Sequence, residues 1–224
     1  MASRANLQGA IDLLQQVLWN EPTAGDPQSL TLELIQYLAD AKQFERSLKL
    51  AKLLYQASAK GPSRLPVAKM AAAIAETSTL PEQRAFWFGE LDRLEPFVHE
   101  TVISRVRALL DLRRNIEARV AIETFLKEKP DWRTAELVKQ LARTWINDDD
   151  VKARQFIKDS LRIQKQAESF ILLGQLEEQR QNRMNAIDAY RDALAIEAQL
   201  TPIRRKLAEL LLKSGDLDDA SAQL

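Results

Sequence analysis

Histidine and cysteine, the residues that most often serve as zinc ligands or as parts of a nucleophile and base pair, are nearly absent from this sequence. His99 is the single histidine, and there is no cysteine. No common zinc site or nucleophile–base arrangement can be built from them. The six glycines are never clustered, which argues against a phosphate-binding loop. We therefore predict no enzyme activity, no catalytic or metal-binding residue and no cofactor, and we interpret His99 as a solvated residue at a helix start.

One acidic run, Asn147-Asp148-Asp149-Asp150, invites a metal-binding interpretation. It lacks the alternating ligand spacing and the central glycine of a calcium loop. It also falls between two expected helices, where an aspartate can cap the following helix and favour its positive dipole end. We predict that this run caps a helix.

Two other clusters have a functional and a structural interpretation. Five arginines could form a nucleic-acid footprint, but acidic residues interleave with them, which favours a salt-bridged surface. The Phe86-Trp87-Phe88 run cannot face one core from a helix, because consecutive residues point about 100° apart. One ring should be exposed or covered by a partner, unless it packs on an adjacent helix pair, which we favour. The arginines are Arg105, Arg107, Arg113, Arg114 and Arg119, and the acids are Glu100, Asp111, Glu117 and Glu123.

The elements that must position these residues are helices. The 224 residues are rich in good helix formers, and the eight prolines border apolar-periodic stretches rather than interrupting them. Short turns between neighbouring helices require antiparallel packing. The expected helices lie near 4–20, 28–41, 44–59, 66–77, 81–95, 97–112, 115–128, 132–146, 149–163, 167–180, 183–198, 202–213 and from 216 onward.

An internal repeat is clearest at 167–198. Phe170-x2-Leu173-Gly174 lies on its first helix and Ala186-x3-Tyr190-x2-Ala193 on its second. Gly174 and Ala186 should let the two helices approach closely, while Phe170 and Tyr190 should fill the space beside the neighbouring pair. The pattern recurs with a period of about 34 residues, which is typical of repeats built from a helix, a turn and a second helix.

This pattern resembles the tetratricopeptide repeat, although Glu177 and Ala198 stand where that family usually has Tyr and Pro. The resemblance implies an all-α, right-handed superhelical solenoid of antiparallel helix pairs. We predict one solenoid over 1–224, and its phase suggests a piece of a longer bacterial array, because it opens on a second helix and stops inside another. The expected parts are a half repeat at 1–22, repeats near 28–61, 65–98, 99–132, 133–166 and 167–200, and a partial repeat at 201–224.

In such a solenoid the first helices line a concave surface, so their solvent-facing residues are the expected protein contacts. Lys/Asn pairs that clamp an acidic C-terminus in the family are missing, so we reject the carboxylate-clamp interpretation. In the 133–166 repeat, where the frame is uncertain by one residue, the corresponding pair is Val138 and Ala142. The predicted contacts are Leu32, Gln36, Lys69, Ile103, Arg107, Ile171, Gln175 and Arg205.

Charge and hydropathy limit the partners. Lys plus Arg and Asp plus Glu both number 32, so no net charge attracts nucleic acid or an anionic membrane. No apolar run reaches the roughly 18 residues of a membrane span, so we expect a soluble chain, without direct membrane insertion, from the cytoplasm or the bacterial periplasm. We expect another protein or peptide segment as partner, and exposed repeat ends would also allow self-association.

Two functions remain open at this stage. The first is a protein-binding scaffold in a bacterial machine for envelope biogenesis, exopolysaccharide export or pilus assembly. The second is a substrate-selecting helper domain of a larger enzyme. RNA recognition would need a matched base-reading residue in each repeat and a basic groove, which the sequence lacks.

Overall fold

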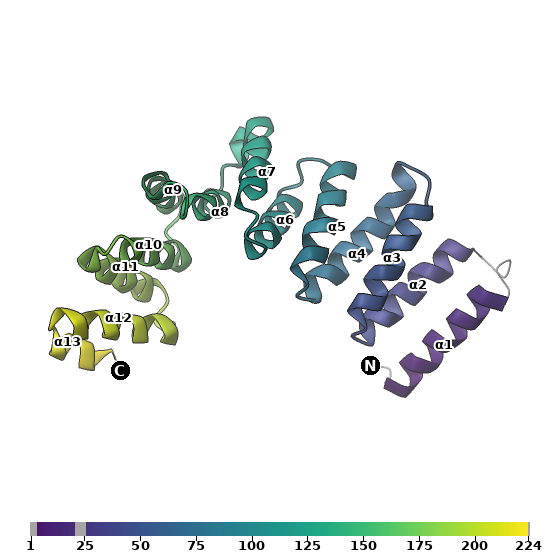
Figure 1. Cartoon of the computed structure of the whole chain (residues 1–224), viewed down its shortest axis with the longest axis horizontal. Helices are drawn as coiled ribbons and strands as arrows, with labels where there is room; N and C mark the ends of the chain where they lie inside the picture. The colour runs from purple at the N-terminus through teal and green to yellow at the C-terminus, as the bar shows by residue number, and fades with distance from the viewer. Residues whose placement is uncertain (1–3, 21–25, 224) are drawn as a thin grey trace. The chain divides into compact units, whose positions relative to one another are not determined.

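The computed structural model describes residues 4–20 and 26–223, which form helices joined by short turns and contain no strand (Figure 1). The chain divides into two compact units, one within residues 1–114 and one within 115–224. The division falls inside the predicted repeat at 99–132, and the predicted single solenoid stays a prediction. No helix in the described part of the chain is both long and apolar enough to cross a membrane.

The described residues of the first unit, 4–20 and 26–114, form six α-helices and one short 3-10 helix. Prolines begin α2, α4 and α5 within their first two positions, where a missing N–H costs nothing. The helices are α1 (Arg4–Asn20), α2 (Pro27–Asp40), α3 (Phe44–Ala57), η1 (Pro62–Arg64), α4 (Leu65–Thr77), α5 (Pro81–Leu94) and α6 (His99–Asp111).

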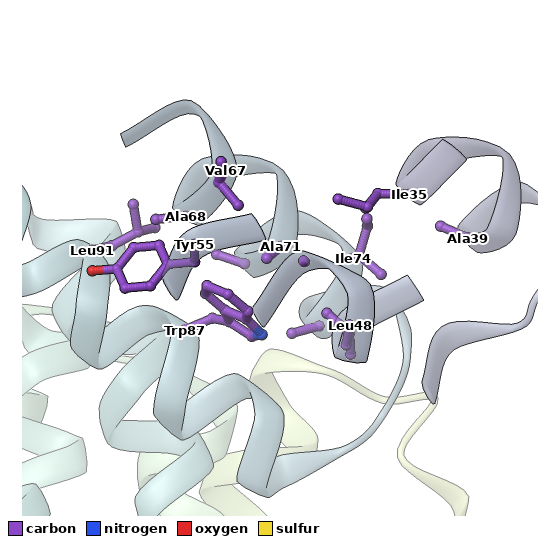
Figure 2. Packing of buried hydrophobic residues seen from close by; sticks show 13 residues of the cluster. Ile35, Ala39, Leu48, Tyr55, Val67, Ala68, Ala71, Ile74, Trp87 and Leu91 are labelled. Atoms are coloured by element: carbon purple, nitrogen blue, oxygen red, sulfur yellow. The ribbon is translucent and has the colours of Figure 1, made fainter. Parts of the chain in front are cut away.

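The core of the first unit forms around Trp87 of α5, which is fully buried. Figure 2 shows its ring beside Tyr55 and Ala71, and the Tyr55 and Trp87 rings meet edge to face with centroids 5.5 Å apart. The small side chains of α4, including Ala68 and Ala71, leave room for these large rings. Phe86 and Phe88 are half-buried and pack against the same cluster, so the interpretation in which the extra rings pack within the fold is confirmed.

Residues 115–223 of the second unit form seven α-helices and one 3-10 helix. Consecutive helices pack against each other, as the pattern of alternating first and second helices predicts. The helices are α7 (Asn115–Glu128), η2 (Pro130–Trp132), α8 (Ala135–Trp145), α9 (Asp150–Ile163), α10 (Ala167–Gln179), α11 (Arg183–Ile196), α12 (Thr201–Ser214) and α13 (Leu217–Ala222).

The turn that follows a first helix recurs near the predicted period. Thr79, Arg113, Gln181 and Gly215 have positive φ and lie 34, 68 and 34 residues apart, while the equivalent Lys42 lies 37 residues before Thr79. At Gln181 the backbone N–H bonds to the carbonyl of Glu178, and the next N–H bonds to that of Glu177, which closes the end of α10. The same two bonds follow Arg113 and Gly215. Only Gly215 is the glycine that usually marks such a turn.

Glu177, the departure from the repeat pattern, is a buried carboxylate. Its side chain is 1% exposed, and the Arg154 guanidinium of α9 donates to it at 2.5 Å. Asp150 and Arg180 form a second ion pair between these helices, at 3.1 Å. A charged pair therefore joins α9 to α10 where the family usually places a tyrosine, and the burial of Glu177 requires such a partner.

The acidic run caps a helix, as predicted. The Asp149 carboxylate accepts a hydrogen bond from the Lys152 N–H at 2.9 Å, and this bond is the main reason that the pKa of Asp149 is lowered. Asp148 pairs instead with Arg119, at 2.5 Å. No group of three His, Cys, Asp or Glu residues that could hold a metal ion exists within residues 4–20 and 26–223.

The close approach of α10 and α11 depends on Gly174. A Cβ atom at this position would lie 2.5 to 2.8 Å from three ring carbons of Tyr190, which is itself 1% exposed. The predicted role of Gly174 in the close approach of the two helices is thus confirmed. Tyr190 was expected only beside the neighbouring pair, but it packs on Gly174 within its own pair as well as in one cluster with Leu207 of α12.

We expect Gly174→Ala to lower the free energy of unfolding by about 1–3 kcal/mol, because the buried ring has no space to yield. The matched control is Gly89→Ala in α5, where a new Cβ would come no closer than 3.8 Å to Arg105. This control should gain roughly 0.5–1 kcal/mol from better helix propensity. Urea unfolding followed by circular dichroism compares the two, and a stabilising effect in both variants would contradict the packing described here.

Candidate functional site

A groove of about 460 Å³ opens in the second unit between α10, α11 and α12. It lies along two first helices, α10 and α12, and the end of Tyr190 from the second helix α11 forms part of its wall. It is lined by Gln175, Glu178, Gln179, Tyr190, Pro202, Ile203 and Lys206.

Glu178 is the central polar residue of this groove. The Tyr190 hydroxyl donates to one of its carboxylate oxygens at 2.6 Å, and the Lys206 ammonium lies 2.9 Å from the other. The contact between Tyr190 and Gly174 supports this geometry, because a ring packed against Gly174 has its hydroxyl within reach of Glu178, one turn farther along α10. Three helices are thus joined by one carboxylate.

Burial and the Glu178 carboxylate both act on the ionisation of the groove residues. Burial is the largest cause that raises the pKa of Tyr190 far above its usual range, and the hydrogen bond to Glu178 adds to it. The same carboxylate raises the pKa of Lys206, chiefly through their hydrogen bond. At neutral pH the phenol of Tyr190 is therefore neutral and Lys206 carries an ammonium group.

The rest of the lining is uncharged. Gln175 and Gln179 are exposed and stand one turn apart on α10, while Pro202 and Ile203 give an apolar edge at the start of α12. Amide groups can both donate and accept hydrogen bonds. The amides and the apolar edge together suit a ligand that has a polar main chain and apolar side chains. The lining holds no nucleophile with an adjacent base.

Comparisons with known proteins support the fold. No family model and no curated protein matches the sequence. Among solved structures, PilW, a type IV pilus biogenesis factor, matches with a TM-score of 0.62 and 15% identity over 90% of this chain and 93% of its own. TTC0263, a TPR protein of Thermus thermophilus, matches with a TM-score of 0.58 and 17% identity over 83% of this chain and 99% of its own. YrrB, a TPR protein with an unusual peptide-binding site, matches with a TM-score of 0.57 and 13% identity over 92% of this chain and 100% of its own.

The chain has a tetratricopeptide-repeat fold. Within the two units, α2, α4, α8, α10 and α12 each pack against the helix that follows them and are the first helices of these pairs.

The tetratricopeptide-repeat fold places most of the predicted contact residues at the surface, but their role in binding stays a prediction. Gln36, Lys69, Arg107, Gln175 and Arg205 are exposed. Leu32 and Ile171 are half-buried and pack against core clusters. Of the eight, only Gln175 lines the groove.

Three residues predicted to face solvent are instead buried. Ile103 is 8% exposed, and Val138 and Ala142 are fully buried. α8 is the shortest first helix and begins only after the 3-10 helix η2, so the frame carried over from the other repeats does not apply to it. On α6, Ile103 lies beside Val102 and Val106 in an apolar stripe that is wider than the repeat pattern indicates.

Two further predictions concern the charged residues of α6 and α7. His99 begins α6 as predicted, but its side chain is only 16% exposed, so it is largely buried rather than fully solvated. Two of the five arginines form salt bridges with acids outside the interleaved group. Arg105 pairs with Asp92 at 2.7 Å, and Arg119 pairs with Asp148 while stacking on the Trp145 ring.

The sequence analysis missed Glu178, Gln179 and Lys206. Their signal was present in the sequence, since Gln175 and Gln179 are four residues apart and share one helix face with Glu178. What it lacked was a reason to turn Tyr190 toward that face, which depends on the packing against Gly174.

The raised pKa of Tyr190 predicts a specific alkaline sensitivity. A group whose pKa is raised by folding favours the folded state below its unfolded value, here 10.0, and this contribution is lost as the pH rises above it. Wild type should therefore lose more thermal stability than Tyr190→Phe does between about pH 9 and about pH 11. Tyr190→Phe should also cost roughly 0.5–1.5 kcal/mol at neutral pH through the lost hydrogen bond. If the melting temperatures of wild type and Tyr190→Phe fell by the same amount over this pH range, that result would argue against a buried, hydrogen-bonded phenol at Tyr190.

Proposed function

We propose that this chain is a protein-interaction module that binds a segment of another protein along its first helices. The observation that carries the proposal is the groove between α10 and α12, with Gln175 on its wall. A rigid surface made by regular helices, with polar groups at fixed positions beside an apolar edge, suits recognition of a peptide segment.

The structural neighbours support the same class of function. YrrB is described as having a peptide-binding site, and PilW is described as a pilus biogenesis factor. On this analogy of fold, we propose assembly of a bacterial envelope or pilus machine as the setting of the interaction. The predicted repeats would then supply further contacts through the exposed first-helix residues Gln36, Lys69, Arg107 and Arg205.

The test is to block the groove without unfolding the chain. Gln175→Arg places a long cationic side chain at the groove wall, and Ala195→Arg places the same side chain at an exposed site on the second helix α11. We expect proteins retained from an extract of the source cell to fall by about tenfold for Gln175→Arg and to stay unchanged for Ala195→Arg, a difference of about 1.4 kcal/mol. Both variants should melt within a few degrees of wild type, because surface substitutions change stability by about 0.5 kcal/mol or less.

Retention is measured by quantitative mass spectrometry of the captured proteins. Loss of the partner only in Ala195→Arg would place binding on the second helices. Equal retention by both variants and wild type would show that this groove is not the contact.

A further inference from the structure

The groove that we propose as a protein-binding site is internally neutralised. Lys206 is the only cation of its lining, and its ammonium lies 2.9 Å from Glu178. The other oxygen of that carboxylate accepts from Tyr190. A carboxylate ligand that approached Lys206 would meet the charge of Glu178 at similar range, and an ammonium ligand would have to compete with Lys206 for Glu178. Neither kind of charged side chain is therefore favoured here.

The uncharged polar groups of the groove are the ones open to a ligand. Gln175 and Gln179 are exposed, and neither side-chain amide has a hydrogen bond within the described residues. Residues four apart on a helix are separated by about 6 Å along its axis. Alternate residues of an extended chain are separated by about 6.6 Å. Two glutamines one turn apart can thus each bond to the main chain of one extended segment, at every second residue, because an amide supplies both the donor and the acceptor that a peptide group needs.

The opposite edge of the groove suits the side chains of such a segment. Pro202 and Ile203 lie at the start of α12 and present an apolar surface beside the polar residues of α10. In an extended chain, side chains point alternately to opposite sides, so one set can rest on this edge while the main chain faces the two glutamines.

We propose that the groove binds an extended, uncharged segment of a partner protein through its main chain, with Gln175 and Gln179 as the hydrogen-bonding pair and Pro202 and Ile203 as the apolar edge. This rests on the proposed function of the groove as a protein-binding site. Glu178 acts as the selectivity residue, because it cancels the charge of Lys206 and so removes the attraction for acidic segments.

The experiment uses three fluorescent peptide pools of about nine residues, long enough to extend past both glutamines at about 3.3 Å per residue. All peptides are blocked at both ends and share the same apolar positions. The remaining positions hold Asn, Gln, Ser or Thr in the neutral pool, Asp or Glu in the acidic pool, and Lys or Arg in the basic pool. Fluorescence anisotropy with the full chain gives the Kd of each pool.

We expect the neutral pool to bind wild type at least about fivefold more tightly than either charged pool, since each charged side chain meets an opposing charge in the groove. Gln175→Ala and Gln179→Ala should each weaken the neutral pool by about fivefold to tenfold, the effect of one lost hydrogen bond. The matched control, Gln56→Ala at an exposed site on the second helix α3, should leave it unchanged. A neutral pool that carries N-methyl groups at every second residue should lose its binding.

Glu178→Gln supplies the decisive variant. It keeps an acceptor for the Tyr190 hydroxyl and removes the charge that lies nearest to Lys206. Only the weaker attraction of Glu209 then acts on Lys206, so the acidic pool should bind about tenfold more tightly than to wild type. A purely structural role of Glu178 would not move this selectivity.

Tightest binding of the acidic or basic pool to wild type would overturn the main-chain mode and leave the groove as a protein-binding site. Variants of Gln175 and Gln179 that bind as Gln56→Ala does would have the same consequence. If wild type bound none of the three pools more tightly than Gln175→Arg does, both the main-chain mode and the proposed function of this groove would be overturned.

Discussion

The Tyr190 ring occupies the space that any side chain at position 174 would fill. This contact brings α10 and α11 together, and it also aims the phenol hydroxyl at Glu178 on the next turn of α10. Because Glu178 in turn holds Lys206 of α12, the position of one ring fixes the polar groups of the groove as well as the packing of the pair. A glycine in mid-helix costs about 1 kcal/mol relative to alanine. The burial of the Tyr190 ring offsets that cost, and the hydroxyl of the same ring donates a hydrogen bond to Glu178 in the groove.

The helices and their period were predictable because they depend on local features. Prolines can occupy the first turn of a helix but not its interior, so Pro81 and Pro202 mark helix starts in the sequence as they do in the structure. The 34-residue period follows from small and large residues at fixed spacing, and it reappears in the positive φ of Thr79, Arg113 and Gln181. Those turns carry no sequence signal, since none of the three residues is a glycine or an asparagine.

The site was predictable only in part. Gln175 was found because it lies on the outer face of a strongly patterned first helix. Ile103, Val138 and Ala142 were misplaced because burial depends on how far a neighbouring helix covers a face, and the irregular entry to α8 changes that coverage. Glu178 and Lys206 belong to different helices, and their pairing across 28 positions of the sequence follows from tertiary packing alone. The buried Glu177 belongs to the same class, since only its pairing with Arg154 makes a carboxylate acceptable there.

The central claim is that Tyr190 lies directly on Gly174. Nuclear Overhauser spectroscopy on a chain labelled at glycine and tyrosine tests it most directly, because the effect is observed only for protons within about 5 Å, the scale of van der Waals contact. The packing described here predicts strong cross-peaks between the Gly174 α-protons and the ring protons of Tyr190. Their absence, in a folded chain that still shows the helical pattern of α10 and α11, would contradict it.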